Sequence, residues 1–273
     1  MRLKLALAAV AIALLLPPAS ASAQWDPSAT ADLGAGYGRT ALSQSILTNT
    51  RDPGSGGGGS EKPKKRKAKK PRKPTQRQLQ TLRFAPDPAV TEANNARLAD
   101  VLLATCPPED TICPPNHAEI IAGLLPTGQF RASFARNLKA LAGGSADNLA
   151  DVAAGAVLLV WEAQRAEPGR QPGFTDAETA GAKRFLRGTR ATLALNRRIR
   201  RMPDADQQEM AETLANVAQH GIALQAVYLG WDGSAPDTAT AAIISTYLGD
   251  VVERWLGVDV DDLRLTRRGF VRR

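Results

Sequence analysis

The chain has 273 residues and a formal net charge of +8, and 43% of its residues are hydrophobic. Residues 61–74 alone carry +8, and the first four residues carry another +2, which leaves −2 for everything else. The overall charge therefore belongs to one short tract, and this excludes a uniformly basic fold of the kind that binds nucleic acid over its whole surface.

Residues 1–23 have the pattern of a cleavable secretory signal peptide. A short basic start is followed by the apolar run 5–16, two prolines and the sequence Ala21-Ser22-Ala23, after which we expect cleavage. The run makes a helix of roughly 18 Å, which is too short for a hydrocarbon core of about 30 Å. We therefore expect an exported protein, periplasmic or secreted, without a transmembrane span in its mature chain.

Residues 24–51 are a low-complexity leader to which no function is assigned. Residues 52–76 form a linker that is first rich in Gly and Ser and then rich in Lys and Arg, and we expect it to be disordered because like charges repel and nothing apolar can be buried. Its basic side chains are Lys62, Lys64, Lys65, Arg66, Lys67, Lys69, Lys70, Arg72 and Lys73.

Three interpretations of this basic tract remain open. After a signal peptide, the tract favours attraction to anionic envelope surfaces, where each basic residue adds about 1 kcal/mol. It can also act as a solvated spacer. Nucleic-acid binding is the third interpretation, but the tract contains no aromatic side chain on which bases could stack. We expect no specific nucleic-acid partner.

Residues 77–273 are predicted to form one all-α domain, bundle-like or orthogonal, with about seven helices. Helical spacing of apolar residues recurs and strand-like alternation is missing. In chain order, the expected helices cover residues 88–105, 116–125, 130–142, 147–166, 175–193, 204–228 and 237–256. Thr175 and Glu178 form a capping box, Gly143 and Gly257 end two of the helices, and residues 258–273 are expected as a short turn and an extended arm.

The fourth of these helices is the most apolar, and we expect it at the centre of the domain. Either Ser145 or Asp147 opens it. Its ten-residue apolar run ends at Glu162, a length that suits a buried core helix and not a membrane crossing. Trp161, near the end of the run, is expected to be buried.

Cys106 and Cys113 lie in one proline-rich loop, and in an exported chain this spacing favours a disulfide. The alternatives are a metal site that adds His117, for which no fourth ligand is evident, and free thiols. The second histidine, His220, is interpreted as solvent-facing. No serine nucleophile is placed beside either histidine, so we assign no catalytic, cofactor-binding or metal residue.

Carboxylates of the central helix are the other candidates for chemistry, because glycan-cleaving enzymes use pairs of them. Asp147 and Asp151 are one helical turn apart, and Glu162 follows on a similar face. The plainer interpretation is that Asp147 is a cap and Asp151 belongs to a solvated first turn, where the helix dipole favours anions. Arg197, Arg198, Arg200 and Arg201 form a second, smaller basic cluster at the end of a helix.

Three stretches resemble a family of exported bacterial proteins known as domain of unknown function 6683. They are residues 145–151 (SADNLAD), Trp161-Glu162 and residues 263–271 (LRLTRRGFV). The resemblance extends over residues 80–273 and implies an exported helical domain, without an activity, a cofactor or a catalytic residue. The basic linker and the cysteine loop are features of this chain and not of the family.

These patterns favour a non-enzymatic exported binding or structural protein whose basic linker associates with anionic envelope surfaces. The alternative is an envelope hydrolase that uses carboxylates of the central helix. The sequence names neither a substrate nor a protein partner.

Overall fold

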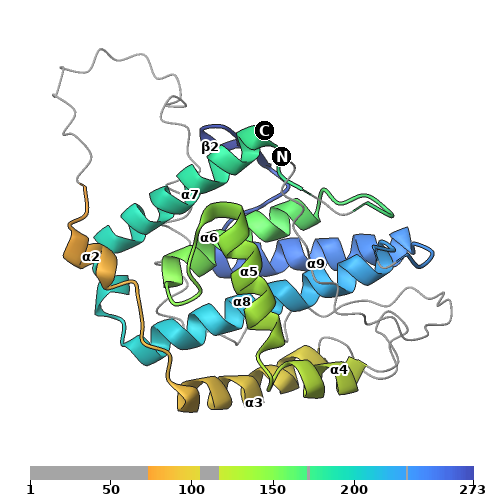
Figure 1. The fold of residues 1–273 in the computed structure, drawn as a ribbon, viewed down its shortest axis with the longest axis horizontal. Helices are drawn as coiled ribbons and strands as arrows, with labels where there is room; N and C mark the ends of the chain where they lie inside the picture. Colours follow the sequence, from red (N-terminus) through yellow and green to blue (C-terminus); the bar gives the residue numbers. More distant parts are fainter. Residues whose placement is uncertain (1–72, 105–116, 171–172, 232) are drawn as a thin grey trace.

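The computed structural model describes residues 73–104, 117–170, 173–231 and 233–273. The helices are α2 (Gln76–Gln80), α3 (Pro88–Ala104), α4 (His117–Leu124), α5 (Gln129–Ala142), α6 (Leu149–Ala163), α7 (Asp176–Leu195), α8 (Asp204–Tyr228) and α9 (Thr238–Leu256), with the 3₁₀ turn η2 (Ile199–Arg201). Two short strands, β1 (Leu263–Thr266) and β2 (Gly269–Arg272), close the chain. The domain is therefore mostly helical, as predicted (Figure 1).

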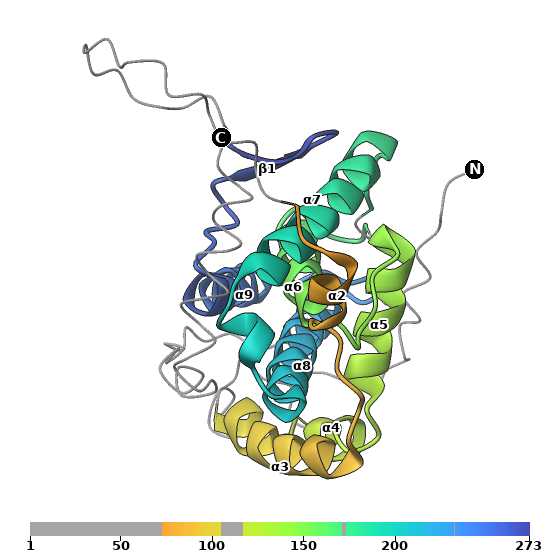
Figure 2. The ribbon, with the colours of Figure 1, turned by 90° about the vertical axis from the view of Figure 1, so that its left-hand side faces the viewer.

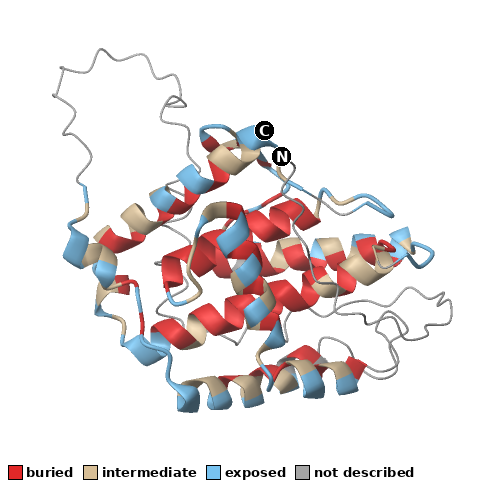
Figure 3. Cartoon of the chain, in the orientation of Figure 1, coloured by how far each residue is buried: buried red, intermediate tan, exposed pale blue. Residues whose placement is uncertain are grey.

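The core is built around α6, which packs against α5, α7, α8 and α9. All fifteen residues of α6 are buried, which agrees with its apolar sequence (Figure 3). Small residues allow this crowding, because a Cβ added at Gly155 would come within 2.8 Å of the Leu138 side chain of α5. A helix that is apolar on every side has to lie inside the protein, and no helix in the described ranges is long and apolar enough to cross a membrane.

Helix α7 packs on α6 and lies along one edge of the domain (Figures 1 and 2). Thr175 accepts a hydrogen bond from the Glu178 N–H while the Glu178 carboxylate accepts from the Thr175 N–H, so the predicted capping box is present. A stripe of buried side chains on α7 faces α6, with Phe185 and Leu186 at its centre.

The chain ends in an antiparallel β-hairpin, where a short turn and an extended arm were expected. Leu263 pairs with Arg272 and Thr266 with Gly269. Gly269 has a φ of 106°, a conformation that favours glycine in this tight connection. The hairpin packs on α7 at Gly181, where an added Cβ would lie 1.9 Å from the Thr266 carbonyl oxygen.

Helix α8 lies on the side of α6 away from α7, and it also contacts α3, α5 and α9 (Figure 2). Gly221 lets α9 approach closely, because a Cβ there would be 2.4 Å from the Leu248 side chain. Asp237 caps α9 by accepting from the Thr240 N–H at 3.1 Å, and Gly257 ends α9 with a positive φ, as expected.

Two details of the sequence prediction for α6 are wrong, one at each end of the helix. Asn148 is the cap, because its side chain accepts from the N–H groups of Ala150 and Asp151, whereas Asp147 is exposed. The helix also ends at Ala163 and not near residue 166. Helix α2 was not predicted, since five residues are too few for a periodic apolar pattern.

Candidate functional site

Polar side chains gather on α8, although this helix is largely buried. The buried polar residues of α8 are Gln207, Gln208, Glu212, Thr213, Asn216, Gln219, His220 and Gln225. Buried polar groups need hydrogen-bond partners to offset their lost hydration. The contacts of this helix therefore indicate whether it serves structure or chemistry.

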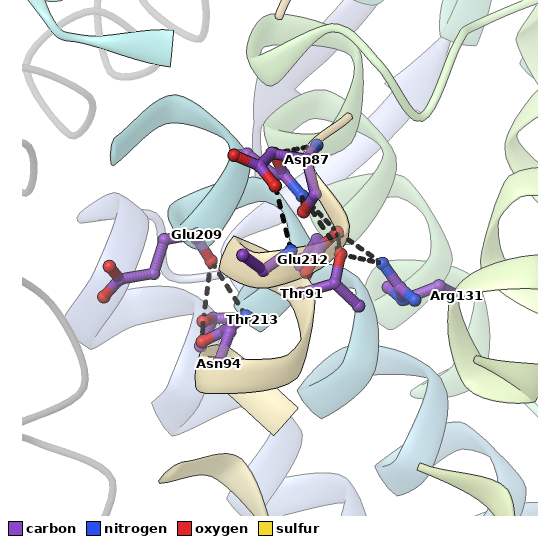
Figure 4. A network of polar contacts seen from close by, with 9 residues as sticks. Asp87, Thr91, Asn94, Arg131, Glu209, Glu212 and Thr213 are labelled. Carbon is purple, nitrogen blue, oxygen red and sulfur yellow. Dashed lines mark hydrogen bonds and ion pairs between the residues drawn. The ribbon is translucent and has the colours of Figure 1, made fainter. Parts of the chain in front are cut away.

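Glu212 lies at the centre of a network that joins α3, α5 and α8 (Figure 4). Its Oε1 accepts hydrogen bonds from the Thr91 hydroxyl at 2.7 Å and from Gln208 Nε2 at 3.0 Å, and it forms an ion pair with Arg131. The Glu212 side chain is 7% exposed and that of Arg131 27%, so the pair is partly shielded from water. Arg131 also donates to the Thr91 hydroxyl at 3.2 Å.

Gln208 extends this network to Asp87, the residue just before α3. Its Oε1 accepts from the Asp87 N–H at 2.8 Å, and its Nε2 donates to the Asp87 carbonyl at 2.9 Å. The Asp87 side chain in turn caps α3 by accepting from the Ala89 N–H. A turn deeper along α8, the Thr213 hydroxyl lies 3.0 Å from Asn94 Oδ1 of α3. The network thus fixes α3 on α8, and most of its polar groups are occupied in doing so.

His117 and His220 form a second buried contact, between α4 and α8. Their Nε2 atoms are 2.9 Å apart, so one ring donates and the other accepts. The ring of Phe130 packs edge-on against His220. Burial lowers the pKa of His117 to about 4, and burial together with the neighbouring His117 lowers that of His220 to about 3. Both imidazoles are therefore neutral near pH 7.

The expected position of His220 was wrong. His220 is 1% exposed where a solvent-facing side chain was expected, and His117 is 4% exposed. The contact between these two histidines, which are 103 positions apart in the sequence, was not predicted. The one sequence feature that pointed to a buried His220 is its place beside Gly221, on a helix that packs closely. Across the described ranges, no three His, Cys, Asp or Glu side chains form a group suited to a metal ion.

The carboxylates of α6 occupy three different environments. Asp147 precedes the helix and is exposed. Asp151 is completely buried, contrary to the solvated first turn expected, because it forms an ion pair with Arg190 of α7 and accepts from the Ser145 N–H at 2.8 Å. The hydrogen bond to Asp151 raises the pKa of Arg190, which keeps this guanidinium charged.

Glu162 lies near the other end of α6 and is 8% exposed. Burial raises its pKa to about 8; the Arg165 charge opposes this shift and the Glu178 charge adds to it. Arg165 forms an ion pair with Glu178 at 2.8 Å and lies over the Trp161 ring, 4.2 Å from its centroid. Glu162 is therefore a protonated carboxyl group at neutral pH beside an ion pair.

Trp161 is buried, as predicted, and its indole N–H donates to the Leu263 carbonyl at 3.1 Å. The Phe174 and Phe270 rings pack against it. Trp161 thus holds the C-terminal hairpin on α6 and serves the core.

Most residues of the other predicted sites lie outside the described ranges. These are Cys106 and Cys113 of the expected disulfide and the basic residues from Lys62 to Arg72. Lys73, the last residue of the basic tract, is described and exposed. Arg197, Arg198 and Arg201 are exposed just after α7, whereas Arg200 is half-buried.

The second half of the chain matches a family model. Residues 151–273 match the family described as family of unknown function (DUF6683). These residues, less than half of the chain, are therefore similar to that family. The match covers α6 from its third residue through the hairpin, so it is narrower than the resemblance over residues 80–273, and it meets the 145–151 stretch only at Asp151. No curated protein and no solved structure matches the chain.

Proposed function

We propose that this protein is a non-enzymatic, exported binding or structural protein, periplasmic or secreted, whose basic linker associates with anionic envelope surfaces. The supporting observation is the placement of charge: residues 61–74 carry +8, and the exposed Lys73 leads directly into α2 of the folded domain. Clusters of basic residues bind anionic surfaces with about 1 kcal/mol per residue. The tract therefore carries enough positive charge to hold the domain at such a surface.

An exported location also supports a disulfide between Cys106 and Cys113, because oxidising compartments favour such bonds between cysteines close in sequence. The signal-peptide pattern of residues 1–23 is the basis of this part of the proposal.

The contacts of the polar core favour a structural role over catalysis. Asp151 is held by Arg190, and Glu212 is held by Arg131, Thr91 and Gln208. Asp151 and Glu162 are eleven residues apart on one helix, hence about 16 Å along its axis. Paired carboxylates of glycosidases are roughly 5–9.5 Å apart, so these two do not form such a pair.

The alternative function is an envelope hydrolase. Glu162 is the observation that favours it, because a carboxyl group with a pKa of about 8 can act as a general acid. Glu178, which lies close enough to influence Glu162, is occupied by its cap and by Arg165. Release of soluble sugar from isolated envelope glycan by the wild-type protein, and its loss in Glu162→Gln, would support the hydrolase.

Vesicle binding tests the proposed function. The chain from residue 24 onward should bind vesicles that contain phosphatidylglycerol, and it should bind vesicles of phosphatidylcholine alone weakly or not at all. The binding should weaken steeply with added salt, because exposed charges are screened beyond roughly 8–10 Å. Deleting residues 61–74 should remove most of this binding and leave the helical content and melting temperature unchanged.

A matched control separates charge from length. A variant in which the nine basic residues of the tract become Gln keeps the linker length, so it should bind as weakly as the deletion. Binding that is unchanged in both variants would contradict the proposed role of the tract, and binding restored by the neutral linker would indicate a spacer.

A further inference from the structure

Charge is unevenly distributed over the fold, although residues 77–273 are close to neutral as a whole. Residues 179–203 contain eight Lys or Arg and no Asp or Glu. Residues 263–273 contain five Arg and again no acid. Between them, residues 204–262 contain eleven Asp or Glu and only one Arg. The near-neutral total thus results from basic and acidic segments that cancel.

The two basic segments come together in space. Residues 179–203 form most of α7 and the η2 turn, and residues 263–273 form the hairpin that packs on α7. Gly181 of α7 touches the hairpin at Thr266, and the Phe185 and Phe270 rings meet edge to face with centroids 4.9 Å apart. Figures 1 and 2 show α7 along one edge of the domain, with the hairpin at one end and α2 near the other. We call residues 183–201 and 264–273 the basic edge.

The charged side chains of the basic edge point to solvent. On α7, Lys183, Arg184 and Arg187 are exposed and lie on the side opposite the buried stripe that contains Phe185 and Leu186. Buried and exposed side chains also alternate along β1 of the hairpin, where Leu263 and Leu265 are buried and Arg264 between them is exposed. Arg197, Arg198 and Arg201 are exposed after α7, and Arg267, Arg268 and Arg272 are exposed on the hairpin.

Few acidic groups neutralise these side chains within the described residues. Arg190, which is half-buried, pairs with Asp151, and no ion pair involves the exposed basic residues of α7, η2 or the hairpin. The acids of these elements and their neighbours stand at the ends of the basic edge. They are Asp176 and Glu178 in the first turn of α7, Asp204 and Asp206 just after η2, and Asp261 and Asp262 before β1. A helix of twenty residues is about 30 Å long, so the basic edge is an extended line of positive charge.

We infer that the basic edge is a second membrane-contacting surface, which lays α7 and the hairpin against the phosphate groups of anionic lipids. This inference rests on the proposed function for its partner, an anionic envelope surface, and it extends that function from the linker to the folded domain. Arginine dominates the edge, and its planar guanidinium group donates in pairs to phosphate oxygens.

Single-stranded nucleic acid fits this surface less well. Sequence-tolerant binding of bases uses exposed aromatic side chains, but the aromatic residues of α7 and the hairpin, Phe185 and Phe270, are buried. Lipid phosphates require only charge and an extended surface, and both are present.

The experiment compares two triple variants in the chain from residue 24 onward. Lys183→Gln, Arg184→Gln and Arg187→Gln remove three charges from the edge. Arg136→Gln, Lys139→Gln and Arg170→Gln remove three exposed charges from α5 and from the loop after α6. Each variant is made with the linker intact and with residues 61–74 deleted, and binding to phosphatidylglycerol-containing vesicles is measured in all four proteins and their parents.

The edge variant should bind more weakly in both backgrounds. Each charge at the surface contributes about fivefold in affinity, so three charges contribute roughly 100-fold at low salt. The control variant should lose less than about fivefold. Circular dichroism should give the same melting temperature for both variants, because all six side chains are exposed.

The outcomes separate this inference from the proposed function. An effect of the linker deletion, with equal binding by the edge and control variants, would overturn the inference and leave the proposed function standing. A selective loss in the edge variant without an effect of the deletion would support the edge and contradict the role of the linker. Tighter, edge-dependent binding to DNA than to the vesicles would overturn the lipid partner.

Discussion

Replacing Glu212 tests whether the network between α3, α5 and α8 holds the domain together. Glu212→Ala leaves Arg131 without its ion-pair partner and removes the acceptor for Thr91 and Gln208. Breaking a fully buried pair costs about 3–5 kcal/mol. Because Arg131 is 27% exposed, water can solvate part of its charge, and the lower end applies. An unsatisfied donor adds about 1 kcal/mol. We expect Glu212→Ala to lower the free energy of unfolding by about 3–4 kcal/mol.

Urea unfolding followed by circular dichroism measures this loss, which corresponds to a melting temperature lowered by roughly 10 °C in a domain of this size. Glu209→Ala is the matched control, one turn earlier on α8. Its ion pair with Arg97 at 2.7 Å joins side chains that are 42% and 37% exposed, and such pairs contribute about 0–1 kcal/mol.

A double-mutant cycle with Arg131→Ala isolates the ion pair from the rest of the network. We expect a coupling free energy of at least about 1 kcal/mol between Glu212 and Arg131. If Glu212→Ala were no more destabilising than Glu209→Ala, the argument that this network fixes α3 on α8 would be refuted.

Three further predictions concern the core and the cysteines. Trp161→Ala should cost about 3–5 kcal/mol in urea unfolding, because the ring is buried and holds Leu263; an unchanged midpoint would contradict this. The His117–His220 pair should make stability fall as pH drops below 6.5 toward 4, because burial lowers both folded-state pKa values and the unfolded chain takes up protons first. A His117→Gln, His220→Gln double variant should lose that part of the pH dependence. A stability profile identical to that of the wild type would contradict this prediction. Intact mass with and without reductant should differ by the mass of two hydrogen atoms if Cys106 and Cys113 are joined, whereas two alkylatable thiols would exclude the bond.

Helices with strong local signals could be predicted from the sequence. The capping box of Thr175 and Glu178 lies within four residues, and both of its hydrogen bonds are present. Every member of the apolar stripe Phe130, Phe134, Leu138 and Leu141 is buried. The central position of α6 followed from its composition alone, since a helix without a polar face has no side to turn to water.

Contacts between distant residues could not be predicted in this way. The Asp151–Arg190 pair and the two histidines are joined only once α6, α7, α4 and α8 are packed. Propensity assigns Asp151 to a solvated first turn, and tertiary packing overrides it by supplying a guanidinium group. Likewise, a summed charge of about −2 concealed the basic edge, because a sum carries no information about which face each charge occupies.

The C-terminal hairpin has a consequence for the order in which the chain can mature. Trp161 donates a hydrogen bond to a carbonyl 102 residues later, and Phe270 of the hairpin covers both Phe185 and Trp161. The α6–α7 layer therefore stays incomplete, with aromatic surface open to water, until the hairpin has been synthesised. Late closure of this kind keeps a nascent chain loosely folded, a state that a translocation channel for unfolded chains can accept and a chaperone can recognise. A nonsense codon just before the hairpin would leave the aromatic core residues without their cover.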